Sequence, residues 1–384
     1  MTVKHVIAIL LLSLMITPSF SQTSSPERHR LRYYGVEPGI LQTGKWNAIT
    51  DVAGVKVGQV TLVEADSIRT GVTAIIPHEG NVFQDKLPAA VFVGNGFGKS
   101  MGTTQIQELG NLETPIVLTN TLNAPKLADA LIGYMLEQKG NEKVGSVNAV
   151  VGETNDGYLN DIRSRHVEKE DLLKALANAQ TGPVCEGNVG AGTGTICMGF
   201  KGGIGTSSRV LPKEKGGYTV GVLVQTNFGG ILDIAGAPVG RELNNYYMAG
   251  EDDYKVDGSC MIIIATDAPL SSRNLERIAK RSFLAFGRVG SFSSNGSGDY
   301  SIAFSTHPDV RVPYRYDQPV QEVPRLMNDD MSPLFLATLE ATEEAIYNSL
   351  FMAEDMTGRE GHEVKALPIP QTLEILKKYN VIKE

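Results

Sequence analysis

A continuous hydrophobic run extends from Cys260 to Ala265 and directly follows Gly258 and Ser259. A short apolar run bounded by polar residues is typical of a strand that is buried on both faces. Other apolar or alternating runs predict further strands, and the segment from Trp46 to Val60 alternates and turns like a β-hairpin. These additional strands are expected at 71–77, 89–93, 144–151, 218–226 and 300–304.

Apolar residues three or four positions apart predict helices between the strands. Leu127, Leu131 and Met135 form such a stripe in the segment 124–138, and a second helix is expected over 170–179. Further helices are predicted to begin at Ser272 and at Ser332, the latter being followed by a proline at the first helical position. Hairpin-like strand pairs alternate irregularly with helices, which favours sheets covered by helices over a doubly wound parallel sheet.

The amino terminus has the pattern of a secretory signal peptide. Lys4 and His5 precede an apolar stretch over 6–16, and small residues stand around 19–21. The apolar stretch is too short to span a bilayer, and a retained anchor is the alternative. We therefore expect residues 1–21 to be removed and the mature protein to be periplasmic or secreted, with no membrane segment of its own.

Composition restricts the classes of partner. The chain has 384 residues, 42% of them hydrophobic, and a net charge of −8. This balance is typical of a globular protein with a large core, and an acidic chain without a basic stripe argues against a nucleic-acid partner. No linker or repeat divides the chain, which favours one large domain.

Metal and nucleotide sites receive little support. The histidines are scattered without ligand spacing, so no metal and no cofactor is expected. The segment 94–100 resembles a phosphate loop but has one residue too few between its glycines, and a glycine-lined pocket wall is the preferred interpretation. The glycine-rich stretch 187–208 lacks the dinucleotide spacing and predicts close backbone packing near a site. Cys185 and Cys197 flank part of it and are candidates for a disulfide, whereas Cys260 is expected to be a free, inert thiol.

The pair Gly258-Ser259 is the strongest candidate for chemistry. A serine at the start of a buried strand is held rigidly, and its hydroxyl can attack the preceding carbonyl and break its own peptide bond. Ser259 would then be an amino terminus whose α-amine acts as a base for its own hydroxyl. Alone the pair is a weak signal, since most Gly-Ser pairs are turns. Asn227, followed by Phe228 and two glycines after a predicted strand, is a plausible oxyanion donor.

Four motifs together resemble the DmpA/BapA family of aminopeptidases, which comprises L-aminopeptidase/D-amidase-esterases and β-peptidyl aminopeptidases. They are Gly258-Ser259 before the buried strand, the segment 227–229, the polar loop 153–161 and the segment 294–299. The resemblance covers nearly all of the mature chain and implies an α+β fold, a four-layer αββα sandwich like that of N-terminal-nucleophile hydrolases. It also implies self-cleavage into a large chain, 22–258, and a small chain, 259–384, that stay together in a homo-oligomer.

The same resemblance implies roles for the catalytic positions. Ser259 would be the nucleophile, Asn227 would donate to the oxyanion, and Ser297 with Asp299 would orient the nucleophile and its amine. Asp299 stands where some family members carry glutamate, so its side chain has a shorter reach. The α-amine of an amino-terminal residue has a pKa of about 7.7–8.0, which makes it an available base near neutral pH.

For the substrate, a small peptide or aminoacyl amide, the resemblance implies that Glu153 binds the free amino group and that Tyr158 lines the same pocket. Two other functions stay open at this point. One is an acyltransferase like ornithine acetyltransferase, against which the serine nucleophile and the signal peptide both count. The other is an exported binding protein that is never cut.

Overall fold

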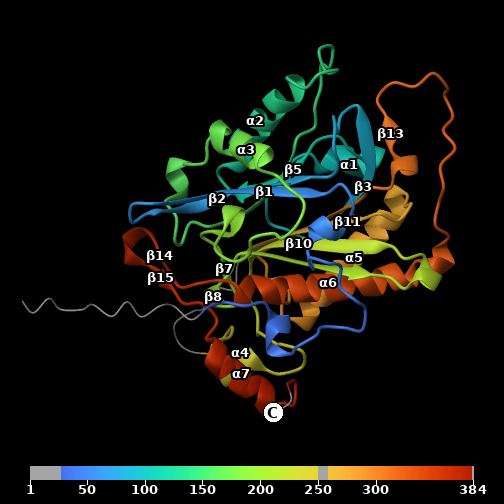
Figure 1. The fold of residues 1–384 in the computed structure, drawn as a ribbon. Helices are drawn as coiled ribbons and strands as arrows, with labels where there is room; N and C mark the ends of the chain where they lie inside the picture. The colour runs from blue at the N-terminus through green and yellow to red at the C-terminus, as the bar shows by residue number, and fades with distance from the viewer. Residues whose placement is uncertain (1–26, 250–257, 383–384) are drawn as a thin grey trace, which may run out of the picture.

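Two β-sheets lie face to face in the computed structural model, and helices cover the outer side of each (Figure 1). The structure describes residues 27–249 and 258–382, so the predicted signal peptide, residues 1–21, lies outside the described residues. The order of layers is helix, sheet, sheet, helix, as expected for an αββα sandwich. No helix in the described ranges has the length and apolar character needed to cross a membrane.

The smaller sheet has four strands in the order β1-β2-β5-β6, and its last pair, β5 and β6, is parallel. Helices α2 and α3 cover its outer face. The elements are β1 (Lys56–Glu64), β2 (Ile68–Ile76), β5 (Ile116–Asn120), β6 (Val150–Thr154), α2 (Ala124–Leu136) and α3 (Lys169–Ala177).

The larger sheet has the order β13-β3-β12-β11-β10-β9, with the short β4 paired to β3 at one end. Helices α5 and α6 cover its outer face. The elements are β3 (Asp85–Gly96), β4 (Asn111–Leu112), β9 (Ile204–Val210), β10 (Thr219–Asn227), β11 (Ser259–Thr266), β12 (Gly298–Ser305), β13 (Val312–Pro313), α5 (Ser272–Arg288) and α6 (Ser332–Phe351).

Short elements connect these layers. Two of them are two-stranded hairpins, and the remaining helices are α1, α4 and α7. Their bounds are α1 (Thr103–Leu109), β7 (Ile196–Cys197), β8 (Phe200–Lys201), α4 (Val239–Glu242), β14 (Met356–Thr357), β15 (Glu363–Val364) and α7 (Ile369–Lys378).

Strand β11 is buried along its whole length, as its apolar run predicts. Cys260 and Ile262 pack in the cluster beneath α5 and α6, whereas Met261 and Ile263 pack in the cluster between the two sheets. The alternation follows from the two-residue period of a strand, which sends successive side chains to opposite faces. Residues at the start of β11 are therefore fixed from both sides by packed layers.

Two strand predictions are wrong, and a disulfide that the sequence left open is not formed. The hairpin expected within 46–60 is formed instead by β1 and β2, because residues 56–64 pair continuously with 68–76. The strand expected at 144–151 begins only at Val150 and continues to Thr154, where it pairs in parallel with β5. Cys185 is exposed and Cys197 is buried, and both thiols are free, so the candidate disulfide is not formed. Cys260 is buried and free as predicted.

Candidate active site

Ser259 is the first residue of β11 and lies between two neighbouring strands. Its backbone pairs with Asn227 at the end of β10 and with Gly298 at the start of β12. Directly paired residues project to the same face of a sheet, so the side chains of Ser259 and Asn227 share one face. The alternation along β11 places that face toward the other sheet. Ser259 is only 6% exposed, so its hydroxyl is held in a largely dry environment.

One backbone N–H contacts both the carbonyl oxygen and the hydroxyl oxygen that would take part in self-cleavage before Ser259. The N–H of Gly298 donates to the carbonyl oxygen of Gly258 at 3.0 Å, and it also approaches Oγ of Ser259 at 3.3 Å. Donation to a carbonyl oxygen stabilises the negative charge that develops there when the carbon is attacked. The Gly258 carbonyl is thus polarised beside the hydroxyl that would attack it.

Only glycine fits immediately before Ser259. A Cβ on Gly258 would lie 1.9 Å from the carbonyl oxygen of Asn227 and 2.8 Å from Cα of Phe228. Both contacts are to backbone, which cannot move aside without disturbing the end of β10. Packing therefore requires a glycine at the position before Ser259.

The amide of Asn227 has a defined orientation. Its Oδ1 accepts a hydrogen bond from the backbone N–H of Ile196 at 3.0 Å. A backbone N–H can pair only with the amide oxygen, so this contact distinguishes Oδ1 from Nδ2. The Nδ2 group is left to donate on the face that Asn227 shares with Ser259, which is the property required of an oxyanion donor.

Ser297 and Asp299 form a buried pair next to Ser259. Oγ of Ser297 donates to Oδ1 of Asp299 at 2.7 Å. Burial raises the pKa of the Asp299 carboxyl to about 6, although hydrogen bonds from Ser297, Ser293 and the N–H of Cys260 oppose that rise. The carboxyl therefore lies beside the 259–260 peptide. The hydroxyl of Ser259 accepts a hydrogen bond from the N–H of Gly298, and within the described residues no hydrogen bond joins it to this pair.

Glu153 belongs to a strand and not to a polar loop, which corrects the interpretation of segment 153–161. It is the fourth residue of β6 and is 3% exposed, because β6 continues alongside β5 to Thr154. Its Oε1 accepts a hydrogen bond from the N–H of Lys99 at 2.8 Å, and its Oε2 accepts one from the hydroxyl of Thr121. The carboxylate is thereby held at the carboxyl ends of two parallel strands, a common location for binding groups.

Gly98 lies between the Glu153 carboxylate and Gly298, the residue paired with Ser259. A Cβ placed on Gly98 would lie 3.2 Å from Oε1 of Glu153 and 3.3 Å from Cα of Gly298. It would also lie 2.9 Å from the ring of Tyr300. The carboxylate of one sheet and the residue that pairs with Ser259 in the other are thus separated by a single glycine. This glycine belongs to the segment 94–100.

Tyr158 is placed differently from the other predicted residues. Its ring is 49% exposed and stacks on His362, with ring centroids 4.3 Å apart. Across the described ranges no hydrogen bond connects it with Glu153 or Ser259, and its carbonyl oxygen lies 2.8 Å from Nδ1 of His362. The structure therefore brings together Ser259, its strand neighbours and Glu153, but gives no contact that adds Tyr158 to them.

Several groups of the candidate site could not be predicted from the sequence. The N–H groups of Gly298 and Lys99 carry no sequence signal, because every residue except proline has one. Thr121 could have been found, since it follows β5 directly and β5 is the parallel neighbour of β6. No set of three or more His, Cys, Asp or Glu side chains in the described part of the chain is arranged to hold a metal ion.

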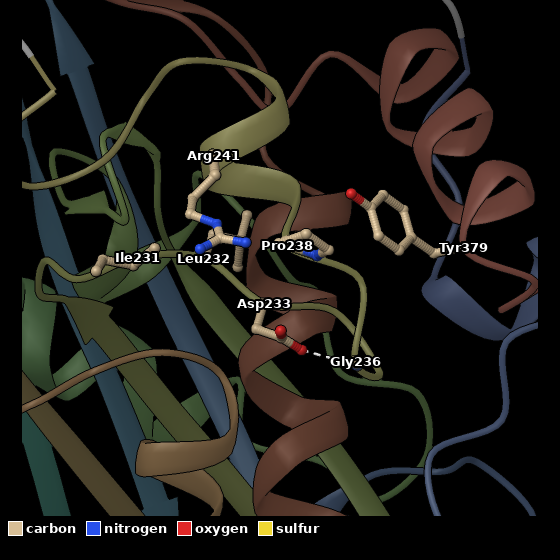
Figure 2. Close-up of a pocket in the computed structure, with 7 residues that line it drawn as sticks. All are labelled: Ile231, Leu232, Asp233, Gly236, Pro238, Arg241 and Tyr379. Atoms are coloured by element: carbon tan, nitrogen blue, oxygen red, sulfur yellow. Dashed lines mark hydrogen bonds between the residues drawn. The ribbon is translucent and has the colours of Figure 1, made fainter.

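A cavity of about 480 Å³ lies elsewhere, between the loop before α4 and helix α7 (Figure 2). Arg241 and Asp233 project toward it from one side and Tyr379 from the other. None of the predicted site residues lines it. The cavity is therefore not the candidate active site.

Comparison with known proteins decides the family. The model of peptidase family S58 matches residues 47–364. The chain belongs to this family. It is 41% identical to "Beta-peptidyl aminopeptidase BapA" of Sphingosinicella microcystinivorans over 378 residues, which cover 93% of this chain and 94% of that protein. This membership confirms the resemblance identified in the sequence.

Similar solved structures support the same conclusion. A beta-aminopeptidase of Burkholderia sp. superposes with a TM-score of 0.84 at 42% identity, covering 91% of this chain and 99% of that one. The L-aminopeptidase D-Ala-esterase/amidase of Ochrobactrum anthropi, described as a variant of the Ntn hydrolase fold, gives 0.84 at 36% identity, with 92% and 99% covered. The chain is therefore a hydrolase, an aminopeptidase, with an Ntn-type fold. Membership of a hydrolase family therefore favours hydrolysis over acyl transfer and over binding alone.

Proposed function

We propose that this S58 aminopeptidase is exported as a precursor that cuts itself between Gly258 and Ser259, and that it then removes amino-terminal residues from small peptides and amides. The observation that carries the proposal is the shared N–H of Gly298, which contacts both the Gly258 carbonyl oxygen and the Ser259 hydroxyl. The apolar stretch of residues 6–16 supports export, and we expect the two cut chains to stay associated in a homo-oligomer.

The proposed self-cleavage needs no external reagent except water. Oγ of Ser259 bonds to the carbonyl carbon of Gly258, the C–N bond breaks, and the hydroxyl proton passes to the departing nitrogen. The resulting ester is hydrolysed, which leaves a carboxylate on Gly258 and a free α-amine and hydroxyl on Ser259. The N–H of Gly298 stabilises the oxyanion during the first step.

Peptide hydrolysis would repeat this chemistry on a substrate. The α-amine of Ser259 takes the proton of its own hydroxyl, which attacks the substrate carbonyl, and the same proton then passes to the leaving amine. Nδ2 of Asn227 donates to the oxyanion, and the buried pair of Ser297 and Asp299 orients the α-amine. Water then releases the acyl group from Ser259.

Glu153 would select substrates that have a free amino group. Its buried carboxylate lies one glycine away from the strand pair that holds Ser259, so an amino group bound there places the first carbonyl near the nucleophile. We propose that β-aminoacyl residues are among the substrates, which the relatives named as β-peptidyl aminopeptidases support. Tyr158 is proposed only as an outer contact, for larger substrates.

A panel of aminoacyl amides tests this function. The panel contains α- and β-aminoacyl forms of one amide, each with a free and with an acetylated amino group. We expect turnover of the free amines, including the β-form, and at least about 10²-fold lower kcat/KM for the acetylated amides, because they leave the Glu153 carboxylate unpaired. Comparable kcat/KM for the free and acetylated forms would contradict the role of Glu153. Turnover of the α-forms alone would contradict the β-aminoacyl assignment.

A further inference from the structure

Within the glycine-rich stretch 187–208, residues 196–201 form a short hairpin that contacts the end of β10 and the residue after it. Its strands are β7 and β8, and the hairpin contacts β10 through two backbone donors. The N–H of Ile196 donates to Oδ1 of Asn227 at 3.0 Å, and the N–H of Met198 donates to the carbonyl oxygen of Phe228 at 2.7 Å. The orientation of the Asn227 amide therefore depends on where this hairpin lies.

Lys201 closes the base of that hairpin. Its Nζ donates to the carbonyl oxygen of Gly192 at 3.1 Å and to that of Gly202 at 2.7 Å, which are residues before and after the hairpin. The N–H of Gly202 bonds to the carbonyl oxygen of Thr195 at 3.1 Å and adds a second connection across the base. The side chain of Lys201 is completely buried.

Burying this lysine is energetically unfavourable. Among the ion pairs of the described residues none includes Lys201, so its amine is satisfied only by neutral carbonyl groups. Burial lowers the pKa of the Lys201 amine to about 7, opposed by the neighbouring Cys197 and Asp156. A methionine of similar length would fill the same space without the cost of removing an amine from water. Filling space in the core therefore does not explain why this position is a lysine.

We propose that Lys201 is a positioning residue for the oxyanion donor: by joining Gly192 to Gly202 it fixes the hairpin, and the hairpin fixes the amide of Asn227. The proposal rests on the proposed role of Asn227. With Ile196 N–H in place, Oδ1 is engaged and Nδ2 points its hydrogens to the reacting carbonyl. If the hairpin shifts, the amide can rotate and present its oxygen, which repels a developing oxyanion.

A double-mutant cycle tests this proposal, using Lys201→Met and Asn227→Ala alone and together. Lys201→Met keeps the length of the side chain and removes its donors. On the processed two-chain enzyme we expect kcat for an aminoacyl amide to fall about 10- to 100-fold with KM changed less than about threefold. In the Asn227→Ala background the same substitution should lower kcat less than about threefold, because the amide through which it acts is already absent.

The outcomes separate the two proposals. Equal losses of kcat in both backgrounds, or no loss in either, would overturn the role of Lys201. Wild-type kcat in Asn227→Ala alone would overturn the oxyanion assignment, and this inference with it. Leu131→Ala, in α2 beyond the smaller sheet, controls for stability: it should lower the unfolding temperature and leave kcat unchanged. If Lys201→Met does not fold, the same cycle is run with Lys201→Leu, which also removes the donors, and the same criteria decide it.

Discussion

The two sheets contribute to the site in different ways. In the larger sheet the candidate reactive residues lie side by side on three hydrogen-bonded strands. Backbone register pairs Ser259 with Asn227 on one side and with Gly298 on the other. In the smaller sheet a single carboxylate, Glu153, is held by a loop N–H and a threonine hydroxyl. In the proposed reactions, the first arrangement positions the bonds that break, and the second positions a negative charge. Changes in the larger sheet should therefore alter kcat and self-cleavage, whereas changes at Glu153 should alter which substrates are accepted.

The largest effect is expected for Gly258→Ala. A methyl group 1.9 Å from the Asn227 carbonyl oxygen forces the 258–259 peptide out of its place. A displacement of about 1 Å can cost about 10²-fold in rate, so self-cleavage should slow by at least that factor. A denaturing gel followed over time measures the rate. Gly145→Ala is the matched control, because Gly145 also precedes a serine and a Cβ there meets nothing within 4 Å. Normal cleavage of Gly258→Ala would show that the register of β10 and β11 does not position the bond.

Asn227→Ala should follow, with a decrease of about 10²–10³-fold in kcat and little change in KM. An oxyanion donor acts mainly in the transition state, which is why the loss should appear in kcat. Steady-state kinetics on the processed fraction measure both constants. A large rise in KM with unchanged kcat would show that Asn227 acts in substrate binding and not in the chemical step. The proposed difference between the two sheets would then not hold.

Glu153→Gln should have a smaller and selective effect. Without the negative charge, kcat/KM for a free-amine substrate should fall by about 10–10²-fold, while the acetylated amide should change less than about twofold. Glu113→Gln provides a matched control, since Glu113 is also a buried carboxylate near the smaller sheet but pairs with Lys86. That control should leave the preference for free amines unchanged. An equal loss on both substrates of Glu153→Gln would indicate a structural role.

The smallest effect concerns the pH dependence of stability, and it isolates Asp299 in the larger sheet. Because burial raises its pKa to about 6, the unfolded chain ionises this carboxyl at lower pH than the folded chain does. Stability contributed by this group is therefore present below pH 4 and is lost as pH rises from about 4 to 6. In the uncut Ser259→Ala background, Asp299→Asn should remove that loss, a difference of about 2–3 kcal/mol in the free energy of unfolding between the two ends of the range. If the free energy of unfolding had the same pH dependence with and without Asp299→Asn, this prediction would be contradicted.

The sequence predicts the larger sheet better than the smaller one. The apolar run of β11 and the strand leading to Asn227 are unambiguous, because both are buried on two faces and their patterns do not depend on partners. Glu153 was expected in a loop because polar residues usually end a strand. Its place in β6 is decided by pairing with β5, residues earlier in the chain. A long-range pairing of this kind leaves no local signal.

The same distinction holds for the groups that complete the site. Ser259, Asn227, Ser297 and Asp299 are side chains whose types suggest chemistry, and they are neighbours in the structure. The contacts of the Gly298 N–H and of the β7–β8 hairpin with Asn227 are made by the backbone. They can be identified only once the pairing of the strands is known. The role of the buried Lys201 depends on carbonyl groups before and after it, and no spacing rule identifies such a contact.

The most direct test of the central claim is the mass and amino-terminal sequence of the purified protein, compared with those of Ser259→Ala. We expect two chains from the unaltered protein, the smaller beginning at Ser259, and one uncut, inactive chain from the variant. A single uncut chain that hydrolyses aminoacyl amides would contradict the claim that Ser259 acts as an amino-terminal nucleophile. So would a Ser259→Ala protein that is still cut between residues 258 and 259.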